Sequence, residues 1–170
     1  MEKSYNDRLF SGHGLRSWLH SSRFLWLKKI LKIYAVNYTS IIELGCYDGK
    51  SINYLPYPPK QYTGYDANWE KGLDVFKEIW KNKYFYQVYS CSSIDEFNPT
   101  KEIFDLAICM ETLEHVPRKD IPIYLNKLAN SCNLYTIITV PNEIGILFFF
   151  KHIFKLFLHY FLPSKRLKPY

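Results

Sequence analysis

The sequence predicts an α/β fold in which a mainly parallel sheet lies between two layers of helices. Short apolar runs that suit strands alternate with helical patterns along the chain, and this alternation is typical of parallel strands joined by helical crossovers. The chain has 170 residues, of which 48% are hydrophobic and 22% are charged. That length and composition suit one packed domain, because single domains commonly contain about 100 to 200 residues.

The first predicted elements are a helix and a strand. Apolar side chains at helical spacing among basic and polar residues predict a helix over residues 15–34. The apolar run at 41–44 predicts a strand that ends at Gly45, and Gly49 follows closely. A helix-compatible stretch continues through Ile52, so this region is predicted to be a strand, a tight turn and a helix.

The later elements continue the alternation. Residues 61–65, 84–89, 104–110 and 135–140 predict four more strands, and residues 69–81 and 124–130 predict helices. The 104–110 run is nearly all apolar, which suits a strand covered on both faces. Pro117 and Pro122 are expected to break the chain before the last helix. Since ligands of such sheets bind beyond the carboxyl ends of the strands, the residues just after each strand are the candidates for function.

The turn after the first strand is the leading candidate for a ligand site. Gly45 and Gly49 have no side chain, so backbone can approach a ligand there, although a tight turn that needs positive φ also explains them. Asp66 follows Gly45 by 66 − 45 = 21 positions. This is close to the spacing of about 20 at which an acidic residue meets ribose hydroxyls. The combination favours an adenosine ligand.

A nicotinamide dinucleotide is disfavoured by the same turn. Its fingerprint requires glycine at the first, third and sixth positions. Here the third position is Tyr47 and the sixth is Lys50. A phenol ring at the third position would obstruct a pyrophosphate unless the ring turned away.

Three segments resemble motifs of one enzyme family. Residues 41–50 (IIELGCYDGK) resemble the first motif of class I S-adenosylmethionine-dependent methyltransferases, with Tyr47 in place of the middle glycine. Residues 104–117 (FDLAICMETLEHVP) and 139–143 (TVPNE) are similar to the fourth-strand and fifth-strand motifs of the branch that includes ubiquinone-biosynthesis methyltransferases. The resemblance implies a Rossmann-like three-layer αβα sandwich with strand order 3-2-1-4-5, S-adenosylmethionine as cofactor, and methyl transfer as the activity.

The resemblance also implies roles for individual residues. The predicted cofactor-binding residues are Glu43 and Gly45 at the methionine end, with Cys46 and Gly49 in the same turn, Asp66 and Ala67 at the ribose, Ser92 and Ser93 at the adenine, and Met110 and Glu111 in the segment that closes the site. Methyl transfer from a sulfonium is an in-line displacement, so positioning of the acceptor supplies much of the acceleration.

His115 is the candidate general base for acceptors that must lose a proton, because an imidazole with its ordinary pKa of about 6.5 suits proton transfer at neutral pH. The alternative is that His115 caps or packs the start of a helix. Glu111, Glu114 and His115 together also offer a divalent-cation site, and small-RNA ribose methyltransferases use a similar cluster. The same letters occur in metal-free relatives, and we expect no metal.

The C-terminal part departs from the family pattern. Relatives usually add a helix and two strands after the fifth strand, whereas this chain leaves room for one mostly apolar stretch, residues 144–162, and a basic tail. We therefore expect five strands, with the last two of the seven-stranded family sheet missing. Lys151 and Lys155 near the middle of the stretch disfavour a spanning helix. It is expected to pack on the sheet, or to meet a membrane interface or a second subunit.

The predicted organisation is a single methyltransferase domain with an N-terminal helical segment (1–38), a cofactor-binding core (39–143) and a C-terminal segment (144–170). Four cysteines without C-x-x-C spacing and a polar N-terminus favour the cytoplasm. The formal charge is +6. Lys28, Lys29 and Lys32 lie in the first predicted helix and Lys165, Arg166 and Lys168 close the chain, while most of the middle is mixed in sign. Because basic residues usually face water, no nucleic-acid partner is expected.

The predicted activity is O- or N-methylation of a small-molecule, glycan or lipid-linked acceptor. Two alternatives remain open from the sequence. One is a non-catalytic S-adenosylmethionine-binding or partner protein without a complete acceptor site. The other is a peripheral membrane-surface protein that acts through its C-terminal helix.

Overall fold

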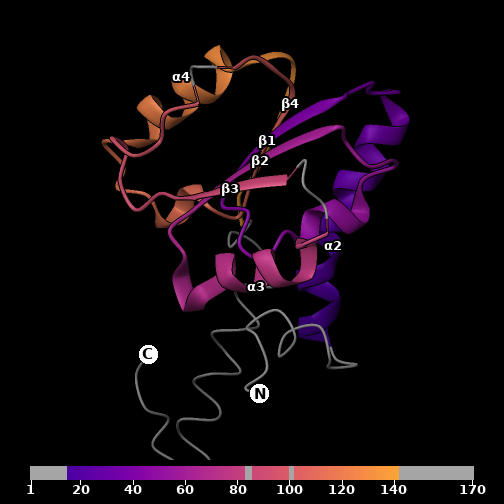
Figure 1. Cartoon of the computed structure of the whole chain (residues 1–170). Coiled ribbons are helices and arrows are strands. Elements are labelled where there is room, and N and C mark those ends of the chain that lie inside the picture. Colours follow the sequence, from indigo (N-terminus) through magenta and orange to yellow (C-terminus); the bar gives the residue numbers. More distant parts are fainter. Residues whose placement is uncertain (1–14, 83–85, 100–101, 142–170) are drawn as a thin grey trace, which may run out of the picture. The chain divides into compact units, whose positions relative to one another are not determined.

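The computed structural model describes residues 15–82, 86–99 and 102–141 (Figure 1). Apart from Pro141, these residues belong to the compact unit Met1–Val140. The predictions for residues 144–162, for the basic tail and for the first 14 residues lie outside the described residues. No helix in the described ranges is both long enough and apolar enough to cross a membrane.

Helices and strands alternate as predicted. In chain order the elements are the helix α2 (Leu15–Ile33), β1 (Ser40–Leu44), the 3-10 helix η1 (Lys50–Tyr54), β2 (Gln61–Asp66), the 3-10 helix η2 (Trp69–Lys71), α3 (Gly72–Trp80), β3 (Tyr86–Ser90), β4 (Phe104–Met110), the 3-10 helix η3 (Leu113–His115), α4 (Ile121–Asn130) and β5 (Cys132–Thr139).

The five strands form one parallel sheet in the order β3-β2-β1-β4-β5, which confirms the predicted order. β1 lies at its centre, with β2 and β4 on either side. Every residue of β1 after Ser40 is buried, as is every residue of β4 except Asp105. This burial confirms the interpretation of the apolar run at 104–110 as a strand covered on both faces.

Helices cover both faces of the sheet (Figure 1). On one face, Leu27 of α2 and Phe76 of α3 pack in a buried cluster with Ile41 and Ile108 of the strands. On the other face, α4 contributes Tyr124 and Leu128 to a second cluster around β1 and β4. The alternation of strand side chains between these two clusters produces the three-layer αβα sandwich.

Prolines change two local predictions. The helix expected after the first turn is only the short η1, because the following sequence contains Pro56, Pro58 and Pro59, and proline can neither donate a helical hydrogen bond nor follow a helical residue easily. Pro122, expected to interrupt the chain, instead lies in the first turn of α4. A helix tolerates proline there because that N–H has no partner within the helix.

Element ends differ by a few residues elsewhere. β5 begins at Cys132 rather than at residue 135, because it pairs with the first residue of β4, Phe104, across an irregularity in register. The predicted helix over 69–81 is divided into η2 and α3, since Asn68, Glu70 and Lys71 all have positive φ. That backbone is strained for residues with side chains, and it lies directly after the end of β2.

Candidate functional site

The turn after β1 requires glycine at its first position. Gly45 has φ of 79° and donates its backbone N–H to the carbonyl oxygen of Tyr65 over 2.7 Å. A Cβ on Gly45 would stand 1.9 Å from Oγ1 of Thr112. That hydroxyl donates to the carbonyl oxygens of Leu44 and Met110. Both the backbone conformation and the close approach of the β4 end therefore exclude a side chain.

The rest of the turn is packed against α3. Gly49 has φ of 73°, and a Cβ there would lie 2.5 Å from the ring of Phe76. Tyr47 also has positive φ, at 46°. Its ring occupies the space beside Gly72, where an added Cβ would meet it at 2.3 Å. The phenol is thus engaged with the start of α3, so steric obstruction by Tyr47 is not by itself an argument against a dinucleotide.

Glu43 is buried under the helical layer that contains α2 and α3. The residue is only 2% exposed, and its Oε2 accepts hydrogen bonds from Ser51 Oγ at 2.5 Å and from Tyr62 OH at 2.6 Å. Burial raises the pKa of Glu43 from 4.5 to about 7, and the two hydrogen bonds oppose that increase. In this structure Glu43 joins β1 to η1 and β2.

Asp66 lies at the end of β2, facing the turn. Its Oδ2 accepts from the backbone N–H of Tyr47 at 3.0 Å, and its Oδ1 accepts from that of Asn68 at 2.8 Å. Burial raises the pKa of this carboxyl group, and the backbone hydrogen bonds partly offset the effect. The half-buried carboxylate therefore connects the turn after β1 to the loop after β2.

The neighbouring predicted residues differ in accessibility. Cys46 is buried, with its backbone N–H 3.2 Å from the carbonyl oxygen of Tyr65, and burial raises the pKa of its thiol. Ala67, Ser92 and Ser93 are exposed. The backbone N–H of Ser92 donates to Glu96 over 2.5 Å. The loop after β3 joins the same edge of the sheet, because the N–H of Cys91 donates to the carbonyl oxygen of Asp66 at 2.7 Å.

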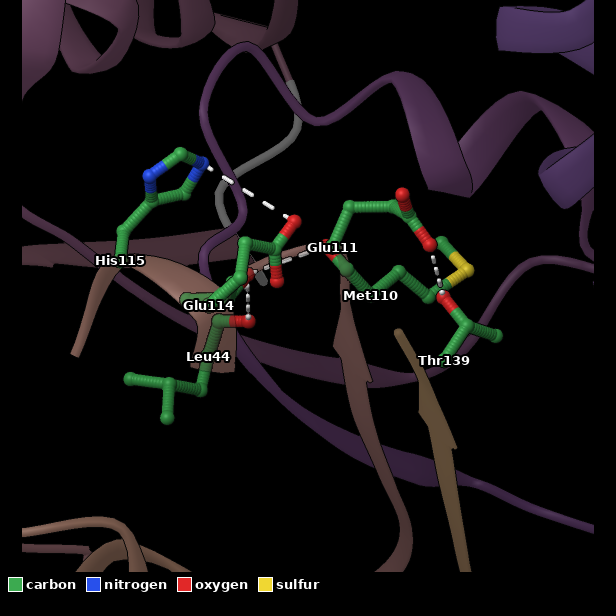
Figure 2. Close-up of polar contacts among 7 residues, drawn as sticks. Leu44, Met110, Glu111, Glu114, His115 and Thr139 are labelled. Atoms are coloured by element: carbon green, nitrogen blue, oxygen red, sulfur yellow. Dashed lines mark hydrogen bonds and ion pairs between the residues drawn. The ribbon is translucent and has the colours of Figure 1, made fainter. Parts of the chain in front are cut away.

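The end of β4 is held by β5. Met110 is buried, and Glu111 follows it with φ of 52°. The backbone N–H of Glu111 donates to the carbonyl oxygen of Thr139, and its Oε1 accepts from Thr139 Oγ1 at 3.2 Å (Figure 2). Burial raises the pKa of Glu111, and the charge of Glu114 adds to the effect.

The acidic and histidine side chains after β4 point in different directions. Figure 2 shows Glu111 turned toward Thr139, whereas Glu114 faces His115. His115 Nε2 lies 3.9 Å from Glu114 Oε1, and the imidazole side chain is 80% exposed. No three His, Cys, Asp or Glu side chains in the described ranges are grouped to hold a metal ion.

The structure thus brings Gly45, Asp66 and the end of β4 to one edge of the sheet, as the sequence predicts. Sequence reasoning missed Ser51, Tyr62 and Thr112. In the parallel register Glu43 pairs with Gly64, and Tyr62, two residues before Gly64, lies on the same face as Glu43; this register is visible only in the folded sheet. The contacts of Ser51 and Thr112 likewise depend on tertiary packing.

Sequence comparison identifies the family. Residues 9–147, well over half of the chain, match a family described as a methyltransferase domain. The chain belongs to this family. Membership confirms the predicted enzyme class, a methyltransferase. Among curated proteins, none matches the sequence significantly.

Solved methyltransferase structures share the fold. The magnesium protoporphyrin IX methyltransferase ChlM from Synechocystis PCC 6803, solved with bound S-adenosylhomocysteine, has a TM-score of 0.62 and 17% identity over 96% of this chain and 75% of its own. The N-methyltransferase NodS from Bradyrhizobium japonicum WM9 has a TM-score of 0.58 and 16% identity, over 69% of this chain and 60% of its own. The putative RNA methyltransferase PH1948 from Pyrococcus horikoshii has a TM-score of 0.51 and 20% identity, over 81% of this chain and 66% of its own. At these identities the likeness establishes the fold alone.

Proposed function

We propose that this methyltransferase binds S-adenosylmethionine at the carboxyl edge of β1, β2 and β4 and methylates an oxygen or nitrogen atom of a small-molecule, glycan or lipid-linked acceptor. The observation that carries the proposal is the 3.0 Å hydrogen bond from the Tyr47 N–H to Asp66 Oδ2. This bond places the glycine turn and the acidic residue side by side, although 19 positions separate them in the sequence.

The residues at this edge fit an adenosine-containing cofactor. A carboxylate has about four acceptor positions, and backbone N–H groups of Tyr47, Asn68 and Trp69 use some of those on Asp66. The remaining capacity suits a ribose hydroxyl. Ala67 and Ser92 leave exposed surface beside it, where an adenine ring can lie. The N–H groups of Gly45 and Cys46 both donate to the carbonyl oxygen of Tyr65, which fixes the turn. The methionine end of the cofactor would lie against this turn.

Glu43 has a different role in this proposal. Because its carboxylate is enclosed by Ser51 and Tyr62, it maintains the shape of the turn rather than meeting the cofactor directly. The bound sulfonium supplies an activated methyl group for direct displacement. The chain then has to orient the acceptor and exclude water.

His115 is the candidate base for acceptors that must lose a proton. It is exposed on η3, directly after the segment that closes the proposed cofactor site. Of the three structural neighbours, one is named for a porphyrin acceptor, one as an N-methyltransferase and one as a putative RNA methyltransferase. One fold therefore serves several acceptors. Most of the middle of this sequence, which contains the proposed site, is mixed in sign, and this supports an acceptor other than nucleic acid.

Calorimetry with S-adenosylmethionine and S-adenosylhomocysteine tests the cofactor site. We expect binding by the intact chain and a loss of at least about tenfold in Asp66→Ala, the cost of one charge-assisted hydrogen bond of about 1.5 to 3 kcal/mol. Asp74→Ala is the matched control, because Asp74 is an exposed aspartate on α3. Equal affinity of the Asp66 and Asp74 variants would reject the proposed ribose contact.

Turnover measurements with sugar, lipid and quinone acceptors test the acceptor class. Formation of S-adenosylhomocysteine that depends on one acceptor would support it. In His115→Gln, transfer to a hydroxyl acceptor should fall about 100-fold or more, while cofactor affinity is retained. Cofactor binding without transfer to any acceptor of the panel would favour a non-catalytic binding role.

A further inference from the structure

The outer side of α2 exposes large apolar side chains to solvent. Trp18, Leu25, Trp26 and Ile33 are 61%, 51%, 57% and 63% exposed. Trp18 and Leu25 are seven positions apart, as are Trp26 and Ile33, so each pair lies along one line of the helix. The two lines are about 100° apart and border the side of α2 opposite its buried residues. We call this surface the α2 outer face. It extends over about 22 Å from Trp18 to Ile33, at 1.5 Å per residue.

The exposure does not come from a poorly packed helix. The opposite side of α2 inserts Phe24, Leu27 and Leu31 into the core beneath the sheet, and each is at most 5% exposed. The helix is therefore fixed to the domain by one side and presents a second apolar side outward. Monomeric proteins seldom expose several large apolar side chains together without a binding partner.

The charge of the same face is entirely positive. Lys28, Lys29 and Lys32 lie among the exposed apolar residues, and α2 contains no Asp or Glu. The Lys29 ammonium lies 5.2 Å from the centre of the Trp26 ring. Within the described residues, no carboxylate forms an ion pair with these three lysines. The face thus combines apolar rings with uncompensated cationic heads.

We propose that the α2 outer face binds an anionic lipid membrane, with α2 lying in the plane of the interface. Tryptophan and aliphatic side chains enter the boundary between head groups and acyl chains, while lysine stems extend so that their ammonium groups meet lipid phosphates. The proposal concerns α2 alone and holds whichever acceptor the methyltransferase uses.

Two other partners fit the face less well. A nucleic acid would pair with the lysines, but its phosphate backbone offers nothing to Leu25 and Ile33. A symmetric second copy would bury the aromatic rings, but it would bring the lysines of one face against those of the other. A lipid surface satisfies the apolar and the cationic groups together.

Vesicle co-sedimentation of the full chain tests the proposal. Vesicles of phosphatidylcholine alone are compared with vesicles that also contain phosphatidylserine, at low and at high salt. We expect binding to the anionic vesicles that weakens as salt rises, because screening reduces the lysine contribution. Circular dichroism and thermal melting verify that each variant folds like the parent chain.

Two sets of substitutions separate the contributions. The triple variant Lys28→Gln, Lys29→Gln, Lys32→Gln should bind anionic vesicles on the order of 100-fold more weakly, about fivefold for each lysine near an anionic surface. Its control, Lys60→Gln, Lys77→Gln, Lys119→Gln, removes the same charge from exposed positions outside α2 and should retain most of the affinity.

The apolar contribution has its own matched pair. Trp26→Ser with Ile33→Ser should weaken binding by at least about tenfold. Ile103→Ser with Ile123→Ser removes exposed apolar side chains from other elements and should bind like the parent.

Several results would overturn the proposal. Absence of binding to anionic vesicles would overturn it. Binding that the α2 substitutions leave unchanged would also overturn it, because membrane contact would then belong to another segment. A dimer in sedimentation velocity that Trp26→Ser with Ile33→Ser dissociates would assign the face to a second copy. Tighter binding to single-stranded RNA than to anionic vesicles would assign it to nucleic acid.

Discussion

The buried carboxyl group of Glu43 makes a specific prediction about stability and pH. Glutamine at this position keeps the size of the side chain and an oxygen that can accept from Ser51 and Tyr62, but it cannot ionise. Because the native pKa of Glu43 is raised from 4.5 to about 7, the folded protein holds this proton more tightly than the unfolded chain does. The contribution of Glu43 to folding stability is therefore greatest below about pH 4.5 and decreases as the pH rises from about 4.5 through 7.

The size of the effect follows from the displacement of the pKa. Each pKa unit corresponds to about 1.4 kcal/mol, so ionisation of Glu43 costs the folded state about 3 kcal/mol above pH 7. Glu43→Gln removes this cost. We expect the variant to match the parent protein below pH 4.5 and to be more stable by up to about 3 kcal/mol at pH 8.

Urea denaturation of both proteins at a series of pH values measures the difference in unfolding free energy. Contributions from other carboxyl groups, such as Asp66 and Glu111, are common to both proteins and cancel. Glu78→Gln, on the exposed surface of α3, reports the general effect of removing one negative charge. A difference between Glu43→Gln and the parent that is the same at every pH would refute the assignment of a raised pKa to Glu43.

Two further predictions concern the backbone at either end of the strands. Gly45→Ala would place a Cβ within 1.9 Å of Thr112 Oγ1 at a φ of 79°. It should therefore lower the unfolding free energy by at least about 2 kcal/mol, as measured by urea unfolding. An unchanged midpoint in thermal or urea unfolding would contradict the geometry of the turn. Asp105→Asn weakens the hydrogen bonds that Asp105 Oδ2 accepts from Thr39 and Ser40 and should cost about 1 kcal/mol at neutral pH. These bonds lower the pKa of Asp105, so the stability difference between Asp105→Asn and the parent should disappear as the pH falls through the pKa of Asp105 in the folded protein. A difference that persists in acid would exclude an ionic contribution.

The central strands and their order could be predicted because their signals are local. Apart from Glu43 and Asp105, the runs at 41–44 and 104–110 are apolar, and burial on both faces explains both. The end of α4 was predicted correctly, while its start was misplaced because Pro122 has opposite meanings in the middle and in the first turn of a helix. β5 depends on pairing with β4, which no local pattern in residues 132–134 reveals.

The candidate site was predictable where chain spacing determines it. Gly45 and Asp66 were identified from a turn and a distance along the sequence, and the structure brings their loops into contact through Tyr47. The environment of Glu43 was not identified, because its partners Ser51 and Tyr62 come from two other elements. Their approach depends on parallel register and on the η1 conformation, which tertiary packing decides.

The hydrogen bonds at the carboxyl edge join the loops of the proposed site to one another. Asp66 accepts from the turn after β1, Glu43 joins β1 to η1 and β2, and Glu111 joins β4 to β5 through Thr139. Loops held in this way need less ordering when a ligand binds. It follows that substitutions at Glu43 should change stability far more than cofactor affinity, whereas Asp66→Ala should change both, since Asp66 is the proposed ribose contact as well as a bond between loops.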